Sequence, residues 1–85
     1  MRSFAHVIAD REGLHARSCV IVVNEANKWQ SAINVSLGDA DANGRSMSEL
    51  LSLHARKGDI IVVSCEGPDE RESALALEAL MRMSI

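Results

Sequence analysis

With 85 residues, 47% of them hydrophobic, the chain is long enough for one globular domain, residues 1–85, but too short for a deeply buried active site. Nine basic and twelve acidic residues give a formal charge of −3. With one Trp, one Phe and no Tyr there is no evident platform for nucleic acid, which we exclude as a partner. The longest apolar run, 19–23, is too short to cross a bilayer, and the polar N-terminal residues do not fit a signal peptide. We therefore expect a cytoplasmic protein without membrane insertion.

The first third of the chain predicts a strand followed by a helix. Residues 3–9 alternate as a strand does, although the pattern leaves open which face is buried. A turn over 10–13 follows, and a helix is expected from Ala16 to about Gln30, with His15 as its capping residue. The β-branched part of this segment favours a strand locally, but so long a strand would bury charged residues, and we interpret it as helix. Its predicted core stripe contains Cys19, Val22, Val23, Ala26 and Trp29 or Gln30.

The middle of the chain predicts a hairpin. Residues 31–37 alternate cleanly, with Ile33, Val35 and Leu37 pointing inward. A return strand over 40–42 would pair with them, because turn residues lie on both sides of it.

The last half predicts two helices around a strand. Ser46 and Glu49 have capping-box spacing, so a helix should start there and continue past His54 to a stop at 57–58. The β-branched stretch 59–65 predicts a strand. A turn then leads to Asp69, which is placed to cap the final helix, with Glu70 and Glu72 near its positive end. The predicted core face of that helix contains Ala74, Leu77, Leu80, Met81 and Ser84.

The predicted order is βαββαβα, with strands too short and too alternating for a parallel sheet. Such a pattern favours the α+β class, with the helices on one face of an antiparallel sheet.

His15 stands at the predicted start of a helix, where the chemistry of an anion site is available. The unpaired N–H groups of Ala16, Arg17 and Ser18 would point out of the positive helix end. Imidazole is nucleophilic at neutral pH and forms a phosphoramidate, whose oxygens these donors and the Arg17 guanidinium could bind. From the residues alone, a plain polar cap and a phosphate carrier are both possible interpretations.

Several motifs together resemble the HPr family, the histidine-containing phosphocarriers of the bacterial phosphotransferase system. They are GLHAR at 13–17, Ser46 at a helix start, Gly58 before a strand, and EGPDE at 66–70. The resemblance implies an open-faced β-sandwich of four antiparallel strands with three helices on one face. It also implies that enzyme I, charged from phosphoenolpyruvate, phosphorylates His15 on Nδ1, and that the group passes to the A domain of a sugar permease.

Further expectations come from the same resemblance. Arg17 would match the active-site arginine, and the protein would be a monomeric relay carrier without a cofactor, not a turnover enzyme by itself. Ser46 matches the serine that a dedicated HPr kinase/phosphorylase modifies in many Gram-positive members, although a plain N-cap would look the same in sequence.

Two positions depart from the family pattern. Ser18 replaces a common proline, which restores an N–H and adds a hydroxyl that could bind a phosphate oxygen. Ser48 stands where a bulky apolar residue is usual, and would leave a polar gap in the docking surface. Small residues at the first position also occur in the nitrogen-related, regulatory branch, so a regulatory binding protein is the alternative function. The predicted partner surface consists of Val20, Ile21, Asn24, Asn27, Met47, Ser48 and Leu51.

The remaining reactive side chains suggest no second site. Cys19 and Cys65 are expected to be reduced, structural thiols. A pairing of His15 with Cys19 could activate a thiolate, but no third orienting residue is visible. His6 and His54 have no metal-ligand spacing to a cysteine or carboxylate, so no metal site is predicted.

Overall fold

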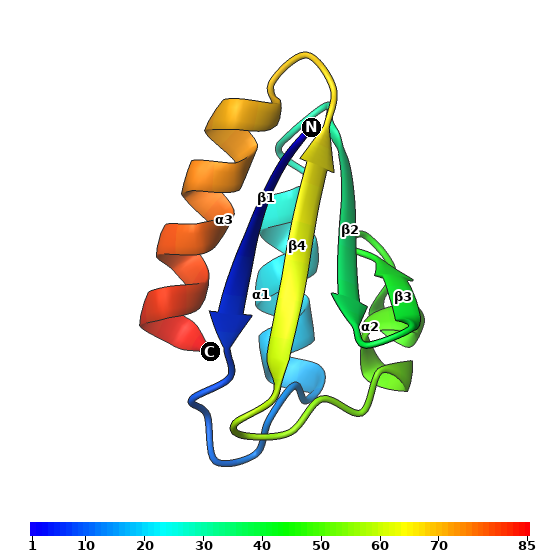
Figure 1. Ribbon diagram of the computed structural model, residues 1–85, viewed down its shortest axis with the longest axis vertical. Coiled ribbons are helices and arrows are strands. Elements are labelled where there is room, and N and C mark those ends of the chain that lie inside the picture. Colours follow the sequence, from blue (N-terminus) through cyan, green and yellow to red (C-terminus); the bar gives the residue numbers. More distant parts are fainter.

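The computed structural model describes residues 1–85 and shows one four-stranded antiparallel sheet in the order β1-β4-β2-β3. Three helices lie together behind the sheet, and its other face is open (Figure 1). This confirms the predicted open-faced sandwich and its βαββαβα order. The strands are β1 (Arg2–Val7), β2 (Ala32–Leu37), β3 (Ala40–Asn43) and β4 (Ile60–Glu66). The helices are α1 (Ala16–Ala26), α2 (Met47–Ser52) and α3 (Glu70–Ser84). None of them has the length and apolar character needed to cross a membrane.

The register of β1 answers the question that its sequence left open. Phe4 pairs with Val63 and His6 with Ile61, and both β4 residues are fully buried. Because neighbouring residues on paired strands share a face, Phe4 and His6 point toward the helices. The alternate residues of β1, ending with the exposed Val7, line the open face.

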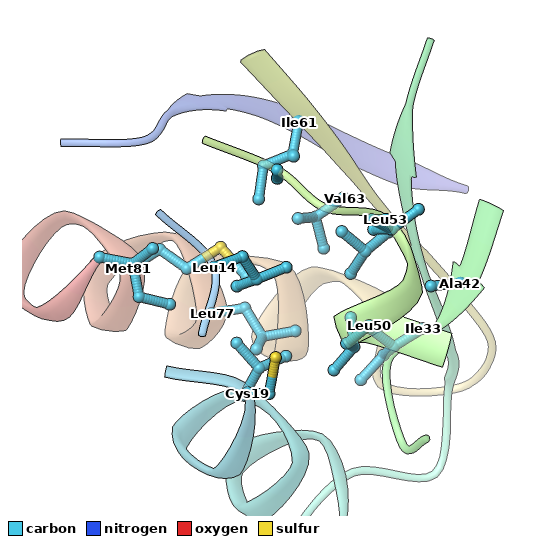
Figure 2. Packing of buried hydrophobic residues seen from close by; sticks show 14 of the residues in the cluster. Leu14, Cys19, Ile33, Ala42, Leu50, Leu53, Ile61, Val63, Leu77 and Met81 are labelled. Atoms are coloured by element: carbon cyan, nitrogen blue, oxygen red, sulfur yellow. The ribbon is translucent and has the colours of Figure 1, made fainter. Parts of the chain in front are cut away.

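The core lies between the sheet and the helices (Figure 2). Leu14, two residues before the start of α1, points into it beside Leu77 and Met81 (Figure 2). It is only 6% exposed, and its N–H donates to the carbonyl of Ala55 at 2.9 Å. The residue that precedes His15 is thus fixed by burial and by a backbone hydrogen bond.

Both of the first two helices end earlier than predicted. Helix α1 stops at Ala26, and Trp29 donates its backbone N–H to the Ala26 carbonyl in a tight turn beyond the helix. Helix α2 stops at Ser52, because His54 adopts a left-handed conformation (φ 52°) that a helix cannot continue through. The prediction that His54 extends the α2 stripe was therefore wrong, and its side chain is exposed.

Two predicted caps also differ. The Asp69 carboxylate does not cap α3; it accepts from the N–H of Gln30, the N–H of Ser31 and the Ser31 hydroxyl instead. Ser46 does accept from the Glu49 N–H at 3.2 Å, but the Glu49 carboxylate binds the N–H of Asn43 and not that of Ser46. In both cases the carboxylate binds a residue outside its helix and not the expected local N–H group.

The buried stripe of α3 is shifted from the prediction. Leu77 and Met81 are buried as expected, and Ala74 and Leu80 are half-buried. Ser84 is exposed, and the fully buried residue of the first turn is Ser73. The Ser73 hydroxyl donates to the Glu70 carbonyl at 3.1 Å, which explains how the core accepts it.

Candidate functional site

His15 is the N-cap residue of α1, with an extended backbone (φ −112°, ψ 179°). The N–H of Cys19 makes the first hydrogen bond of the helix, to the His15 carbonyl at 2.9 Å. The N–H groups of Ala16 and Arg17 have no acceptor within the protein. The positive end of α1 is therefore open beside the imidazole, where an anion could bind.

Ser18 closes the first turn of α1 around His15. Its hydroxyl accepts from the His15 N–H at 2.9 Å and donates to the His15 carbonyl at 2.9 Å. In return, the His15 side chain faces the N–H of Ser18, which completes a capping box. Ser18 is 1% exposed, so its hydroxyl would have to leave the cap to bind a phosphate oxygen. In this chain two hydrogen bonds of Ser18, and not the ring of a proline, therefore fix the first turn of α1.

Arg17 is exposed and makes no ion pair or hydrogen bond, so its guanidinium is free to bind an anion. It lines a surface pocket of about 160 Å³ together with His15, Ser18, Ile21 and Ser84. The last of these comes from the end of α3, which the sequence did not connect with the site. A pocket that joins an imidazole, a helix N-terminus and an unpaired cation suits a phosphoryl group.

Two acidic residues of the turn before α1, which the sequence did not connect with the site, lie next to the imidazole. The Asp10 Oδ2 atom is 3.3 Å from His15 Nε2, and the Glu12 Oε2 atom is 3.9 Å from it. The Glu12 N–H and then the His15 ring lower the pKa of Asp10 below its ordinary value. In the sequence, the only indication was an aspartate five residues before the histidine, with a glycine turn between them. The two side chains come close only when this turn is folded.

These three residues are also the ones that could hold a metal ion. Their candidate ligand atoms all lie within 4.8 Å of one another, and carboxylate with imidazole is a donor set that Zn²⁺ accepts. The set lies on the surface, and Asp10 already accepts two hydrogen bonds. We assign no metal to it.

The loop that carries the site is held from two sides. The N–H groups of Ala9 and Asp10 both donate to the Ile85 carbonyl at 2.8 Å, beyond the end of α3. Gly13 has a left-handed φ of 69° and packs against the backbone of Ala55 and Arg56. The site is therefore assembled at one end of the sheet, at the bottom of Figure 1, from segments far apart in the sequence.

The predicted partner surface lies on α1, α2 and the turn after α1, and α1 and α2 pack against each other. Val20 is 44% and Leu51 37% exposed, so apolar anchors stand on both helices. Ile21 and Met47 are half-buried, and the exposed members of the set also include Asn24, Asn27 and Ser48. The hydroxyl of Ser48 lies 3.3 Å from that of Ser46, which places the polar gap at the start of α2.

The cysteines and His6 do not line the pocket of His15. Cys19 and Cys65 are both fully buried free thiols, and burial raises the pKa of each, which disfavours the thiolate required for activation by His15. Burial also lowers the pKa of His6, whose Nε2 atom is buried without a hydrogen-bond partner. A neutral imidazole is thus favoured among the core residues.

Fold and site together define a class: a small open-faced sandwich that presents a histidine at the N-terminus of a helix. The family model for the PTS HPr component phosphorylation site matches residues 3–83. The chain belongs to the HPr family of the phosphotransferase system.

Individual relatives agree over nearly the whole length. The phosphocarrier protein HPr of Mycoplasma pneumoniae is 35% identical over 82 residues, which cover 95% of this chain and 93% of that protein. Among solved structures, HPr-C-His from Thermoanaerobacter tengcongensis matches with a TM-score of 0.91 at 33% identity, over 96% of this chain and 92% of its own. A histidine-containing phosphocarrier protein from a mycoplasma matches with a TM-score of 0.94 at 25% identity, over 98% of this chain and 94% of its own.

Proposed function

We propose that this protein accepts a phosphoryl group on Nδ1 of His15 from enzyme I and passes it to the A domain of a sugar permease. The observation that carries the proposal is the position of the imidazole at the N-terminus of α1, in one pocket with the unpaired Arg17. The family to which the chain belongs supports it.

The chemistry of a carrier asks for a site that stabilises phosphohistidine without trapping it. The free N–H groups of Ala16 and Arg17 would bind the phosphoryl oxygens. The N–H of Ser18 would join them once the imidazole ring turns away from it. An exposed contact with a helix N-terminus contributes only about 0.3 to 1 kcal/mol, so the group remains easy to pass on. We assign Arg17 the role of a mobile cation that follows the phosphoryl group.

The partner surface described above would serve both proteins of the relay, with the monomer as the acting form. Val20 and Leu51 are its exposed apolar anchors, and such anchors dominate the affinity of small interfaces. At Ser46, a phosphate would add roughly two negative charges next to this surface, so phosphorylation by an HPr kinase would weaken docking of an acidic partner.

A second candidate is a regulatory protein that acts by binding. The exposed, polar Ser48 at the start of α2 favours it, because a permease A domain would lose one apolar contact there. Ser48→Phe should then raise affinity for an A domain about tenfold or more, since an apolar anchor contributes on the order of 1 to 3 kcal/mol. An unchanged affinity would remove this explanation of the serine.

The test of the carrier function uses enzyme I and labelled phosphoenolpyruvate. We expect an acid-labile, base-stable label on His15 of the wild-type protein and none on His15→Ala. If the wild type takes no label while a control HPr does, the carrier function is wrong. Binding of His15→Ala to a permease A domain, measured in parallel, separates lost chemistry from lost docking.

A further inference from the structure

We propose that Asp10 is a positioning residue for His15. It accepts the hydrogen of Nε2 and so holds the imidazole in the tautomer whose Nδ1 lone pair faces the N-terminus of α1. This inference rests on the proposed function, and it adds a role for a loop residue outside the motif GLHAR.

Asp10 is itself held in place by three hydrogen bonds. Its Oδ1 atom accepts from the Glu12 N–H at 2.9 Å, its backbone N–H donates to Ile85 at 2.8 Å, and its carbonyl accepts from the Gly13 N–H at 2.9 Å. The remaining carboxylate oxygen, Oδ2, is the one that lies 3.3 Å from His15 Nε2. Both side chains are only partly exposed, at 30% and 26%.

The tautomer follows from what a carboxylate can do. An ionised carboxylate only accepts hydrogen bonds, so the ring nitrogen that faces Asp10 has to carry the hydrogen. A neutral imidazole carries a single N–H, and Nδ1 is then left with its lone pair.

Phosphoryl transfer uses that lone pair. The bond from Nδ1 to phosphorus forms, the bond from phosphorus to the donor breaks, and its electron pair leaves with the donor. As Nε2 keeps its hydrogen, the imidazole ring gains positive charge during the step. The Asp10 carboxylate faces this charge and lowers the barrier electrostatically, as an oriented acid does beside a catalytic histidine.

Glu12 provides a matched control. Its Oε2 atom is 3.9 Å from His15 Nε2, beyond hydrogen-bond distance, and its side chain is 76% exposed. Glu12→Gln removes a negative charge close to the ring but leaves the Asp10 contact intact. It therefore measures what charge alone contributes.

Two variants of Asp10 separate a positioning role from a structural one. Asp10→Asn keeps an oxygen for the Glu12 N–H and turns an amide N–H toward Nε2, which favours a hydrogen on Nδ1. Asp10→Ala loses both contacts, so nothing at this position favours either tautomer of the His15 ring. If Asp10 positions His15, Asp10→Asn is the slower variant; if Asp10 only supports the loop, Asp10→Ala is the more damaged one.

The experiment measures the nitrogen-15 shifts of the His15 ring at a pH where the imidazole is neutral, and the rate of phosphorylation by enzyme I. We expect one tautomer, with the hydrogen on Nε2, in the wild type and in Glu12→Gln, and a shift toward the other in Asp10→Asn. The rate constant should fall at least tenfold in Asp10→Asn, a barrier about 1.4 kcal/mol higher, and less than twofold in Glu12→Gln.

An unchanged tautomer in Asp10→Asn, or a rate no lower than that of Asp10→Ala, overturns the proposal. The ring shifts do not require enzyme I, so they decide the role of Asp10 in orienting the ring even if the wild type is never phosphorylated. That last result would overturn the proposed function instead.

Discussion

Gly13→Ala should destabilise the protein far more than Gly38→Ala, although both glycines have a left-handed backbone. Their φ angles are 69° and 59°. An alanine in this conformation costs about 1 to 2 kcal/mol, of which about 0.4 to 1 kcal/mol is returned by the stiffer unfolded chain. A Cβ at Gly38 meets nothing within 4 Å, so about 1 kcal/mol is the whole expected loss there.

At Gly13 the new Cβ would clash with the Ala55 carbonyl oxygen and lie 2.8 Å from the Arg56 Cα. Both contacts are with backbone, which cannot rotate away, so the two loops have to separate. Overpacking of this kind costs about 1 to 3 kcal/mol, and we expect a total loss of about 3 kcal/mol. The same Ala55 carbonyl accepts from Leu14, so the movement should also displace His15 and slow its phosphorylation.

The assay is urea unfolding followed by far-ultraviolet circular dichroism, with equal slopes required before free energies are compared. The predicted order is wild type, then Gly38→Ala, then Gly13→Ala, with the two variants about 2 kcal/mol apart. A difference below about 0.5 kcal/mol would show that the contact between the loop of Gly13 and the turn after α2 is not tight.

Three other predictions follow from the same structure. Ser46→Ala should lower the free energy of unfolding by about 1 kcal/mol and Ser46→Asn by much less, because only the second keeps a cap; equal losses in urea titrations would contradict this. Cys19 and Cys65 should not react with a thiol reagent until the protein is unfolded, and rapid labelling of the native protein would mean that burial does not protect them. The N–H of Gln30, with the hydroxyl and N–H of Ser31, holds the pKa of Asp69 below its ordinary value. Its ionised form therefore adds stability at neutral pH that is lost as the pH falls through the folded pKa. The stability gap between wild type and Asp69→Asn should thus narrow in acid, and a constant gap would refute the assignment.

Local signals predicted the elements of this fold well, because they depend on residues close together in sequence. The alternation of Ile33 and Val35 predicted β2, and both residues are buried. The helical spacing of Cys19 and Val22 predicted a helix despite the β-branched composition of the segment, and α1 forms there with both residues buried. Turn residues set the strand boundaries to within two positions, whereas both α1 and α2 were predicted too long.

What the sequence could not predict depends on contacts between distant segments. Asp69 binds the turn around Ser31, 38 residues away, and so leaves the helix cap for which it was predicted. The contact of Asp10 with His15 depends on how the turn between them folds against Ala55 and Ile85. Such partners compete with local ones, and only the folded chain decides between them.

The sequence predicted the central residues of the candidate site but not the residues around them. His15 at a helix N-terminus beside Arg17 followed from the capping position and was strengthened by a family resemblance. Nothing local indicated that Ser84 would line the same pocket, since it comes from the last turn of the chain's last helix. Ser18 was expected to offer a hydroxyl to phosphate, and in the structure it holds the backbone of His15 instead.

The most direct test of His15 as a phosphoryl carrier is a transfer measurement on the wild-type protein. It is labelled by enzyme I and phosphoenolpyruvate, separated from the donor, and mixed with a permease A domain while the phosphorylated residue is mapped before and after. We expect label on His15 that leaves it and appears on the A domain. Label that never appears on His15 would contradict the carrier site. Label that forms there but stays in the presence of active A domains would contradict the relay.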